Sequence, residues 1–323
     1  MILNPDSEPL TRNIEDYPDG IIIPIDKPYR WTSADVIRKV KFAAIRHFGK
    51  KNLKVGHAGT LDPLATGVLL VCIGKATKLA ETLQSHDKEY IAGITFGATT
   101  PSYDLEKEID RFFPHEHLTS EAVEAALPAF IGEQDQIAPL FSAKSVDGVR
   151  AYELARNLHK EGKTLDEAAE ELIRVSRISI TELELMSYRS VGDSFENNPS
   201  HANATNPVRS KSPLGCLHTA LDPCGQEGST VFKTTPTDTE SNASSRINVT
   251  DNSALGLPRA EVRMACSKGT YVRAFARDLG EALGSGAHLD SLQRSRSGIF
   301  RVEDALTVEQ VIALIPSPTH ITH

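Results

Sequence analysis

Apolar residues along this chain either alternate with polar residues or form short continuous runs, and both patterns are typical of β-strands. Residues 67–73 (GVLLVCI) are apolar almost throughout and contain several β-branched side chains, which predicts a buried strand. Further strands are expected at residues 20–26, 88–97, 173–188 and 259–267, and within residues 287–300.

Other stretches place apolar residues at the spacing of an amphipathic helix. Within residues 33–48 these are Val36, Val40, Ala43, Ala44 and Phe48. Basic side chains take the other faces of this helix, and we expect Ser33 to cap its N-terminus. Further helices are expected just before residue 83 and at residues 119–133 (which include Pro128), 150–158, 274–283 and 307–314.

Residues 190–258 differ in composition from the rest of the chain. They are rich in Ser, Thr, Asn, Pro and Gly and contain only two aromatic residues. Such a stretch cannot bury enough apolar surface to offset the entropy lost on ordering. We therefore expect a disordered insertion between two parts of one folded domain, residues 20–189 and 259–323, with residues 1–19 as an N-terminal extension.

The composition is that of a soluble globular protein, with 323 residues, 40% apolar and 24% charged. No run approaches the roughly 20 apolar residues that a membrane helix needs. The acidic N-terminus does not resemble a signal or transit peptide. The four cysteines, Cys72, Cys216, Cys224 and Cys266, form no CxxC pair. We therefore expect a cytoplasmic protein without structural zinc, and small core positions for Cys72 and Cys266.

The net charge of -8 hides a strongly basic segment. Residues 27–78 contain eleven Lys and Arg but only two acidic residues, Asp35 and Asp62. Local positive potential attracts a phosphate backbone, whatever the charge of the whole chain. A solvated helix face is the alternative explanation of such a run. Because this segment surrounds a candidate reactive residue, we favour a surface that binds a polyanion.

That residue is Asp62, on a glycine-rich loop that precedes the buried strand. Residues 56–63 read GHAGTLDP, and Gly56 and Gly59 allow tight turns and the close approach of a ligand. Pro63 disfavours the helical conformation at Asp62. The carboxylate is therefore expected on a stiff turn against a rigid strand, where reactive groups are usually mounted. From the Asp-Pro pair alone, a simple structural turn is the alternative.

The longer string GHAGTLDPLATGVL resembles the catalytic motif of the TruB-type tRNA pseudouridine synthases. The resemblance implies that Asp62 is the catalytic nucleophile. It also implies that His57 fills the gap left when the target base leaves its stack, and that Gly59 and Thr60 contact the substrate.

Segments on either side of this motif resemble the same family. The DKP–WTS–DV pattern resembles its first motif, in which Lys27 is either a phosphate contact or a structural contact. The K-x-Y pattern at residues 88–90 implies that Tyr90 stacks on the target base and takes part in the later proton removal. Many relatives carry T-D-T-x-D where this chain has Pro101 and then Asp104, so Asp104 is kept only as a candidate for a structural or RNA contact.

The segment CSKGTYVRAFARDLGEALGSGAH, residues 266–288, resembles the third motif of the family. The resemblance implies that Arg273 pairs with Asp62 and keeps it ionised, and that Tyr271 contacts both Asp62 and the base. The sequence Leu292-Gln293-Arg294 resembles the L-x-R strand of the family, in which Leu292 covers the uracil.

The resemblance further implies an α+β, pseudouridine synthase fold. This is a mixed, mostly antiparallel central sheet flanked by helices, with the active-site cleft across its middle. The two folded parts, 20–189 and 259–323, would form the catalytic domain. Too few residues follow it for the RNA-binding PUA domain that bacterial relatives often carry.

Pseudouridine formation breaks the N1–C1′ bond, turns the uracil and joins C5 to C1′. It needs no redox step or phosphate energy, so we expect no cofactor. A single nucleophile is the minimum, and Asp62 would attack either C1′ or C6. The resemblance implies that the substrate is uridine 55 in the T-loop of tRNA, bound through the T-arm by a monomer.

Two alternatives are weighed against this interpretation. A nucleoside or glycoside hydrolase also uses an aspartate at an anomeric carbon, but it normally needs two carboxylates, and the motif supplies only Asp62. A non-catalytic tRNA-binding or folding protein would require only the basic segment.

Overall fold

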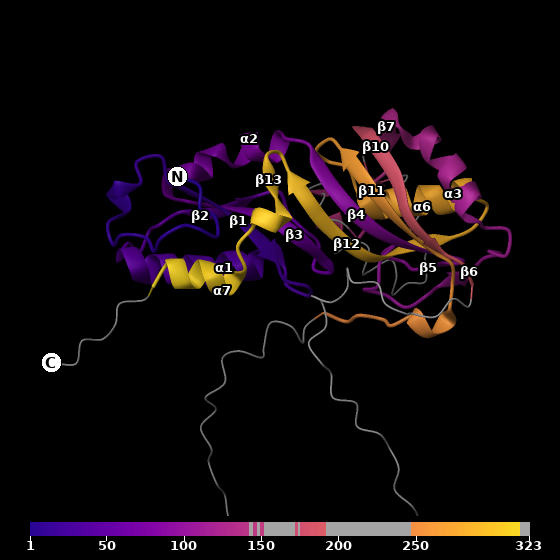
Figure 1. Cartoon of the computed structure of the whole chain (residues 1–323), viewed down its shortest axis with the longest axis horizontal. Helices are drawn as coiled ribbons and strands as arrows, with labels where there is room; N and C mark the ends of the chain where they lie inside the picture. The colour runs from indigo at the N-terminus through magenta and orange to yellow at the C-terminus, as the bar shows by residue number, and fades with distance from the viewer. Residues whose placement is uncertain (142–144, 147–148, 152–171, 174, 192–246, 317–323) are drawn as a thin grey trace, which may run out of the picture.

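The computed structural model describes residues 1–141, 145–146, 149–151, 172–173, 175–191 and 247–316. Through these residues runs a nine-stranded sheet (Figure 1). Its strands are β1 (Ile21–Lys27), β2 (Val55–Ala58), β3 (Ala65–Ile73), β4 (Lys88–Phe96), β7 (Gly132–Gln136), β10 (Ser176–Arg189), β11 (Arg259–Cys266), β12 (Ala287–Ser297) and β13 (Phe300–Arg301). The two-stranded pairs are β5 (Ala98–Thr99) with β6 (Arg111–Phe112) and β8 (Ser145–Val146) with β9 (Val149–Arg150).

The order of the main strands is β1-β3-β12-β4-β11-β10-β7, with β2 added to β3 and β13 to β12. Every pair is antiparallel except β3 and β12, which run parallel along residues Leu292 to Arg294 and Ala65 to Gly67. This confirms the predicted mixed, mostly antiparallel sheet. Because the short parallel contact lies at the middle of the sheet, it joins the two halves directly beside the loop of Asp62.

Helices cover both sides of the sheet in Figure 1. The α-helices are α1 (Ser33–Phe48), α2 (Ala80–Ser85), α3 (Ser120–Ala126), α6 (Val272–Ala282) and α7 (Val308–Leu314). The 3-10 helices are η1 (Ile14–Asp16), η2 (Gly74–Leu79), η3 (Leu127–Phe130), η6 (Ser253–Leu255) and η7 (Val302–Asp304). Helices α1 and α7 lie together against the β1–β3 half, while α3 and α6 pack on the β4–β10 half. No helix in the described ranges is long and apolar enough to cross a bilayer.

One hydrophobic core extends through both halves of the sheet. It includes Val40 of α1, Val71 of β3, Ile94 of β4, Val262 of β11 and Phe275 of α6, all essentially buried. Each such side chain contributes about 1.5–3 kcal/mol through burial. Cys72 and Cys266 are also buried, which confirms their predicted core positions, and burial raises the pKa of each thiol to about 11.

Helix α1 spans the predicted residues, but Thr32 is its N-cap, where we predicted Ser33. The Thr32 hydroxyl accepts a hydrogen bond from the N–H of Asp35, and the Asp35 carboxylate accepts one from the N–H of Thr32. This reciprocal arrangement is a capping box. The Ser33 hydroxyl is instead bonded to Leu61 in the loop of Asp62.

The predicted loop at residues 56–63 begins as a strand. Residues Val55–Ala58 form β2, in which His57 pairs with Val71 of β3. The turn is therefore confined to residues 59–64. The glycine-rich sequence obscured this strand, because the partner that orders it lies beyond the turn.

The helix predicted at residues 119–133 is too long. Thr119 caps α3, which ends at Ala126 and is followed by η3, with Pro128 near its start. Residues Gly132–Gln136 then form β7, the edge strand paired with β10. A polar sequence such as GEQDQ carries little strand signal by itself, and pairing with a neighbouring strand decides its conformation.

Two other predicted segments lie only partly within the described residues. Residues Val149–Arg150, at the start of the helix predicted at 150–158, form β9, and residues 152–158 lie outside the described part. Of the insertion predicted at 190–258, residues 192–246 also lie outside it. Its last part is ordered, because residues 247–258 include η6, a buried Leu257 and main-chain hydrogen bonds to Leu105 and Phe96.

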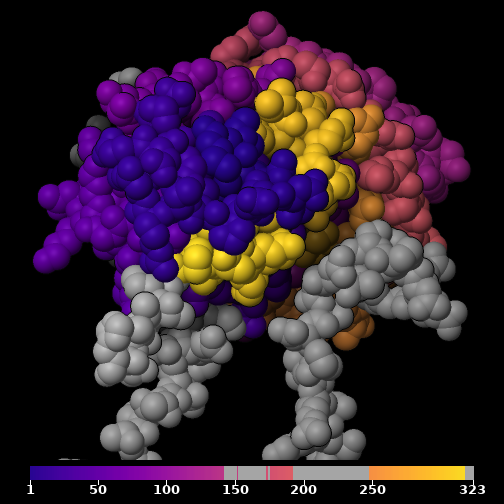
Figure 2. All heavy atoms as spheres, turned by 60° about the vertical axis from the view of Figure 1, so that its left-hand side comes forward, coloured from indigo at the N-terminus to yellow at the C-terminus, as the bar shows by residue number. Residues whose placement is uncertain are grey.

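The N-terminal and C-terminal segments lie side by side on one face (Figure 2). Leu3 is fully buried, and the N–H of Leu10 donates to the carbonyl of Leu314. The buried imidazole of His47, in the last turn of α1, contacts carbonyl oxygens of both segments, those of Thr11 and Pro316. The predicted N-terminal extension is therefore packed onto the core.

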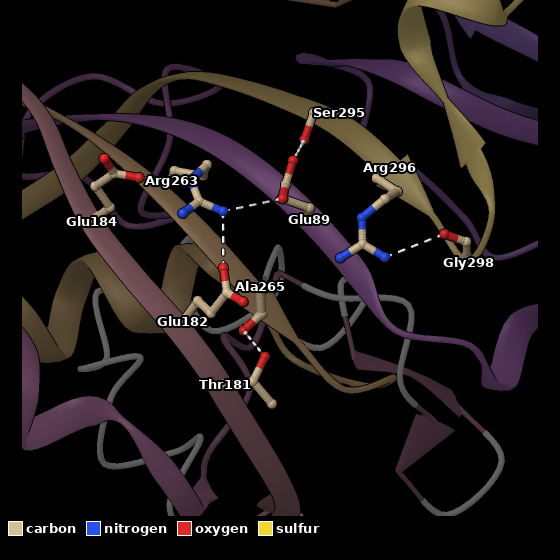
Figure 3. A network of polar contacts seen from close by, with 9 residues as sticks. All are labelled: Glu89, Thr181, Glu182, Glu184, Arg263, Ala265, Ser295, Arg296 and Gly298. Atoms are coloured by element: carbon tan, nitrogen blue, oxygen red, sulfur yellow. Dashed lines mark hydrogen bonds and ion pairs between the residues drawn. The ribbon is translucent and has the colours of Figure 1, made fainter.

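The outer face of the β4–β10 half carries a network of charged side chains (Figure 3). Arg263 of β11 pairs with Glu89 of β4 and with Glu182 and Glu184 of β10 at 2.8–3.3 Å. Ser295 of β12 donates to Glu89. These cross-strand contacts link four adjacent strands, β12, β4, β11 and β10.

The burial of the Lys88 side chain, at the start of β4, can be tested through the pH dependence of stability. Its buried amine donates to the carbonyl oxygens of Gln84 and His86. Burial, reinforced by the charge of nearby Arg294, lowers the pKa of Lys88 to about 8. A lysine in an unfolded chain has a pKa of about 10.4. Between those values the unfolded chain binds one more proton, so stability rises with pH.

We therefore expect the free energy of unfolding of the wild-type protein, relative to that of a Lys88→Met variant, to rise by roughly 1–2 kcal/mol between about pH 7.5 and pH 9.5. Urea unfolding at the two pH values measures this difference. The exposed Lys75→Met variant is the control and should show no such change with pH. A difference between wild type and Lys88→Met that is equal at both pH values would contradict the prediction.

Candidate active site

Asp62 lies on the turn between β2 and β3, and hydrogen bonds hold the residues on both sides of it. Leu61 exchanges two bonds with the Ser33 hydroxyl of α1, at 3.0 and 3.1 Å. The carbonyl oxygen of Pro63 accepts a bond of 3.2 Å from Lys27 Nζ of β1. The turn is thus fixed to two elements of the core, as precise positioning of a reactive side chain requires.

Arg273, the second residue of α6, pairs with Asp62. Its Nε lies 2.9 Å from Asp62 Oδ2 and 3.6 Å from Asp104 Oδ2, and its Nη1 donates to the carbonyl of Ser102 at 3.0 Å. The Arg273 side chain is 6% exposed, whereas that of Asp62 is 42% exposed. Burial alone would lower the pKa of Arg273, but the two carboxylates outweigh it and leave that pKa raised.

The Asp104 carboxylate is itself held in place by the turn that contains it. Its Oδ1 accepts hydrogen bonds from the Ser102 hydroxyl at 2.6 Å and from the N–H of Glu106 at 2.9 Å. The Thr100 hydroxyl donates to the Asp104 carbonyl at 2.7 Å. A second, rigidly held carboxylate therefore faces Arg273 beside Asp62.

A pocket opens beside this ion pair. It is lined by Asp62, Leu64, Ala65, Asp104, Leu105, Arg273, Leu289, Asp290, Ser291 and Leu292. Its wall combines aliphatic side chains with a few charged groups, which is typical of a site for a partly apolar ligand with polar edges.

Arg294 of β12 supports the turn from below. Its guanidinium is 1% exposed and donates to three carbonyl oxygens, those of Val68 at 2.7 Å, Gly59 at 3.2 Å and Thr60 at 3.5 Å. Gly67 allows this close approach of β3 and β12, because a Cβ there would lie 2.3 Å from the Arg294 carbonyl oxygen. A planar fork with several donors suits this task better than a lysine would.

Tyr90 of β4 lies beside Arg294 in the sheet and is buried. Burial raises the pKa of the Tyr90 hydroxyl, while the positive charge and hydrogen bond of Arg294 oppose this shift. The charge of Asp62 also raises that pKa. Tyr90 is therefore held as a neutral phenol near the turn of Asp62.

Lys27 does not take the substrate-binding role that the sequence left open. It is fully buried, and its Nζ donates to the carbonyl oxygens of Pro28, Trp31 and Pro63. Burial lowers the pKa of Lys27 to about 7, although Asp62 opposes the shift. Because no phosphate can reach it, Lys27 is a structural contact that holds the turn.

The other predicted residues differ in their distance from the pocket. Leu292 lines it, whereas Thr60 is exposed at the tip of the turn. Tyr271 is half-buried beside a separate apolar cluster, and its main chain is bonded to the side chain of Gln136. His57 lies on β2, where burial lowers its pKa and its Nδ1 meets no partner among the described residues.

The sequence analysis assigned no role to Arg294 or Asp290. It also did not predict that Asp104 faces Arg273 in the pocket. Arg294 lies two positions after Leu292 and therefore on the same face of the strand. Leu292 is partly buried against the core, so a charged residue in phase with it points toward the same side of the sheet. Asp290 lines the pocket and is bound by Arg259 at 2.7 Å, and no local pattern indicates that pair.

Solved structures show the same fold. The chain aligns with a chain from the crystal structure of a Cbf5–Nop10–Gar1 complex with a TM-score of 0.51 and 21% identity, covering 96% of this chain and 58% of that one. With the sheet described above, this similarity defines the class as the pseudouridine synthase fold.

Sequence comparisons identify the family. The model of the TruB family pseudouridylate synthase N-terminal domain matches residues 46–196, and that of the tRNA pseudouridylate synthase B C-terminal domain matches residues 273–317. The chain is 42% identical over 293 residues to the tRNA pseudouridine synthase B of Phocaeicola vulgatus, covering 91% of this chain and 92% of that protein. It is 41% identical over 290 residues to that of Bacteroides thetaiotaomicron, covering 90% of each. This chain belongs to the TruB family of pseudouridylate synthases, which are isomerases.

The support of the turn by Arg294 can be tested with Arg294→Lys. A lysine keeps the charge, but its single nitrogen replaces the three separate nitrogens with which Arg294 bonds these carbonyls, so we expect a loss of about 2–3 kcal/mol in unfolding free energy. We also expect turnover to fall about 10–100-fold, because the carboxylate of Asp62 would no longer be held in position. Urea unfolding and steady-state kinetics measure the two effects.

Arg296→Lys, on the same strand, is the matched control. Arg296 is half-buried and donates to the carbonyl of Gly298, away from the turn. Turnover that is equally reduced in both variants, or unchanged in Arg294→Lys, would contradict the assigned role.

Proposed function

We propose that this protein converts uridine 55 in the T-loop of tRNA to pseudouridine, acting as a cytoplasmic monomer that binds the T-arm. The curated relatives carry the name tRNA pseudouridine synthase B. The observation that carries the proposal is the contact of 2.9 Å between Asp62 and the buried Arg273, both of which line one pocket with Leu292. The basic segment at residues 27–78 provides charge for the phosphate backbone.

Asp62 is the nucleophile in this proposal. Its carboxylate attacks either C1′ of the ribose or C6 of the uracil, the N1–C1′ bond breaks, and the ring turns so that C5 bonds to C1′. The bond between Asp62 and the substrate then breaks, because C5 displaces the carboxylate from C1′ or because the carboxylate leaves C6. C5 loses its proton and N1 gains one, so the product has the same composition as the substrate and Asp62 is regenerated. Arg273 stabilises the charged carboxylate before the attack and after its release, because it is buried and cannot exchange its partner for water.

The remaining residues of the proposed site bind and orient the base. Leu292 covers the uracil from the floor of the pocket, and Tyr90 stacks on it and assists the removal of the C5 proton. Tyr271 contacts the base from the start of α6, and His57 occupies the space that the flipped uridine leaves in the RNA. The Asp62 side chain is 42% exposed without RNA, so the bound base itself completes its shielding from water.

The pocket contains the second carboxylate that a hydrolase would need, namely Asp104. Hydrolysis through a pair of carboxylates requires one of them to donate a proton to the leaving group. Asp104 Oδ2 faces Arg273 at 3.6 Å and Asp104 Oδ1 accepts two hydrogen bonds, so both carboxylate oxygens already have partners within the protein. We therefore prefer isomerisation to hydrolysis.

Replacement of Asp62 by Asn tests the proposed function. Asn keeps the size of the side chain but is a poor nucleophile, so we expect pseudouridine formation to fall at least about 10³-fold. Tritium release from C5-labelled uridine in tRNA measures the reaction, because isomerisation removes the C5 hydrogen. Binding of tRNA should stay within about threefold of the wild-type value.

Asp135→Asn, an exposed carboxylate on the edge strand β7, is the control and should retain full activity. Release of free uracil would indicate a hydrolase. Asp62→Asn protein that is as active as wild type, or a wild type that binds tRNA without any reaction, would refute the proposal.

A further inference from the structure

Arg30 has an unusual backbone conformation beside the catalytic turn. Its φ of +65° lies in the left-handed region, and Tyr103 is the one other non-glycine residue with a positive φ in the described part of the chain. Glycine adopts this conformation without a steric clash. Strain of this kind gathers at functional sites, where the side chain has a task that glycine cannot perform.

Arg30 joins two segments that are far apart in the sequence. Its main-chain N–H donates to the carbonyl of Pro63 at 2.9 Å, next to Asp62. Its guanidinium Nη2 donates to the carbonyl of Ile247 at 2.8 Å. Its Nε is buried and makes no hydrogen bond to any described residue, which is unfavourable for stability. Strain and an unpaired donor together indicate a residue that serves to position something else.

The segment that Arg30 holds, residues 247–257, is called the strap below. The N–H of its Thr250 donates to the carbonyl of Leu105 at 2.8 Å. The amide nitrogen of its Asn252 lies 3.4 Å from Nε2 of the buried His288 of β12. Figure 1 shows the strap, in orange with η6, along the edge of the molecule next to β5 and β6.

The strap lies against the pocket of Asp62. Leu105, to which it is bonded, lines that pocket together with Asp104 and Asp290. Tyr29 precedes Arg30 and is half-buried. Burial raises the pKa of the Tyr29 hydroxyl, the charge of Arg30 opposes this rise, and the charges of Asp104 and Asp290 add to it. Tyr29 therefore lies near the carboxylates that line the pocket. Tyr29, Arg30 and the strap therefore belong to one wall beside the pocket.

We propose that the strap is an RNA-contacting wall of the active-site cleft and that Arg30 is the positioning residue that fixes it there. The proposal rests on the proposed tRNA substrate. Asn248 and Ser253 of the strap are exposed, and amide and hydroxyl groups of this kind bond to the sugars and phosphates of RNA. Because Arg30 acts through the strap and does not touch the uridine, its loss weakens RNA binding and spares the chemical step.

The decisive variant is Arg30→Gly. It removes the hydrogen bond to Ile247, and glycine adopts the positive φ of this position without a steric clash. We expect the KM for a tRNA transcript to rise about three- to tenfold while kcat stays within about twofold. We expect the thermal midpoint to be equal to or higher than that of wild type, because the strain is removed. Hydrogen–deuterium exchange at Thr250, measured without RNA, should become faster.

Arg177→Ala is the matched control for the loss of one positive charge. Arg177 is exposed on β10 and pairs with Glu133 and Asp135, at the far edge of the sheet. It should leave the KM unchanged. Asn252→Ala, which releases the strap from His288, is a second variant and should raise the KM in the same way as Arg30→Gly; it decides the question if Arg30→Gly does not fold.

Three results would overturn the proposal. Unchanged exchange at Thr250 would show that Arg30 does not fix the strap. Faster exchange with an unchanged KM would show that the strap does not contact RNA. A lower thermal midpoint with kcat and KM affected together would show a merely structural role. The exchange measurement needs no RNA, so it stands even if the wild-type protein fails to modify tRNA and the proposed function is wrong.

Discussion

The ion pair between the buried guanidinium of Arg273 and the carboxylate of Asp62 is the interaction on which the site depends. A guanidinium removed from water is strongly unfavourable unless its N–H groups find partners. Arg273 finds them in Asp62, Asp104 and the carbonyl of Ser102. Because these groups come from separate segments, satisfying one buried cation brings helix α6, the turn at residues 100–104 and the turn of Asp62 together.

Two further buried basic side chains bond to the main chain of the same turn. Lys27 takes the carbonyl of Pro63, and Arg294 takes those of Gly59 and Thr60. The turn is therefore fixed on both sides of Asp62, while the carboxylate itself stays open to the pocket. Such an arrangement would hold the proposed nucleophile in place before the substrate arrives and would require little rearrangement during the reaction.

Much of the fold could be predicted from local patterns. The helix at residues 33–48 and the strand after the turn have strong periodicity and few alternatives, and both are confirmed. The predictions were wrong where a partner decides the structure. The polar residues of β7 form a strand because β10 is beside them, and Thr32 replaces Ser33 as the cap because the Ser33 hydroxyl is bonded to Leu61.

The sequence by itself determined most of the long helices and strands, the family and the candidate residue Asp62, because periodicity and a contiguous motif are local properties. Only the tertiary structure decided which charged side chains are buried and what they bind. Lys27 donates a hydrogen bond to the turn at Pro63, Asp104 is a second partner of Arg273, and Arg30 donates a hydrogen bond to Ile247. Those outcomes depend on distances between segments up to 217 residues apart, and no pattern within one segment contains that information.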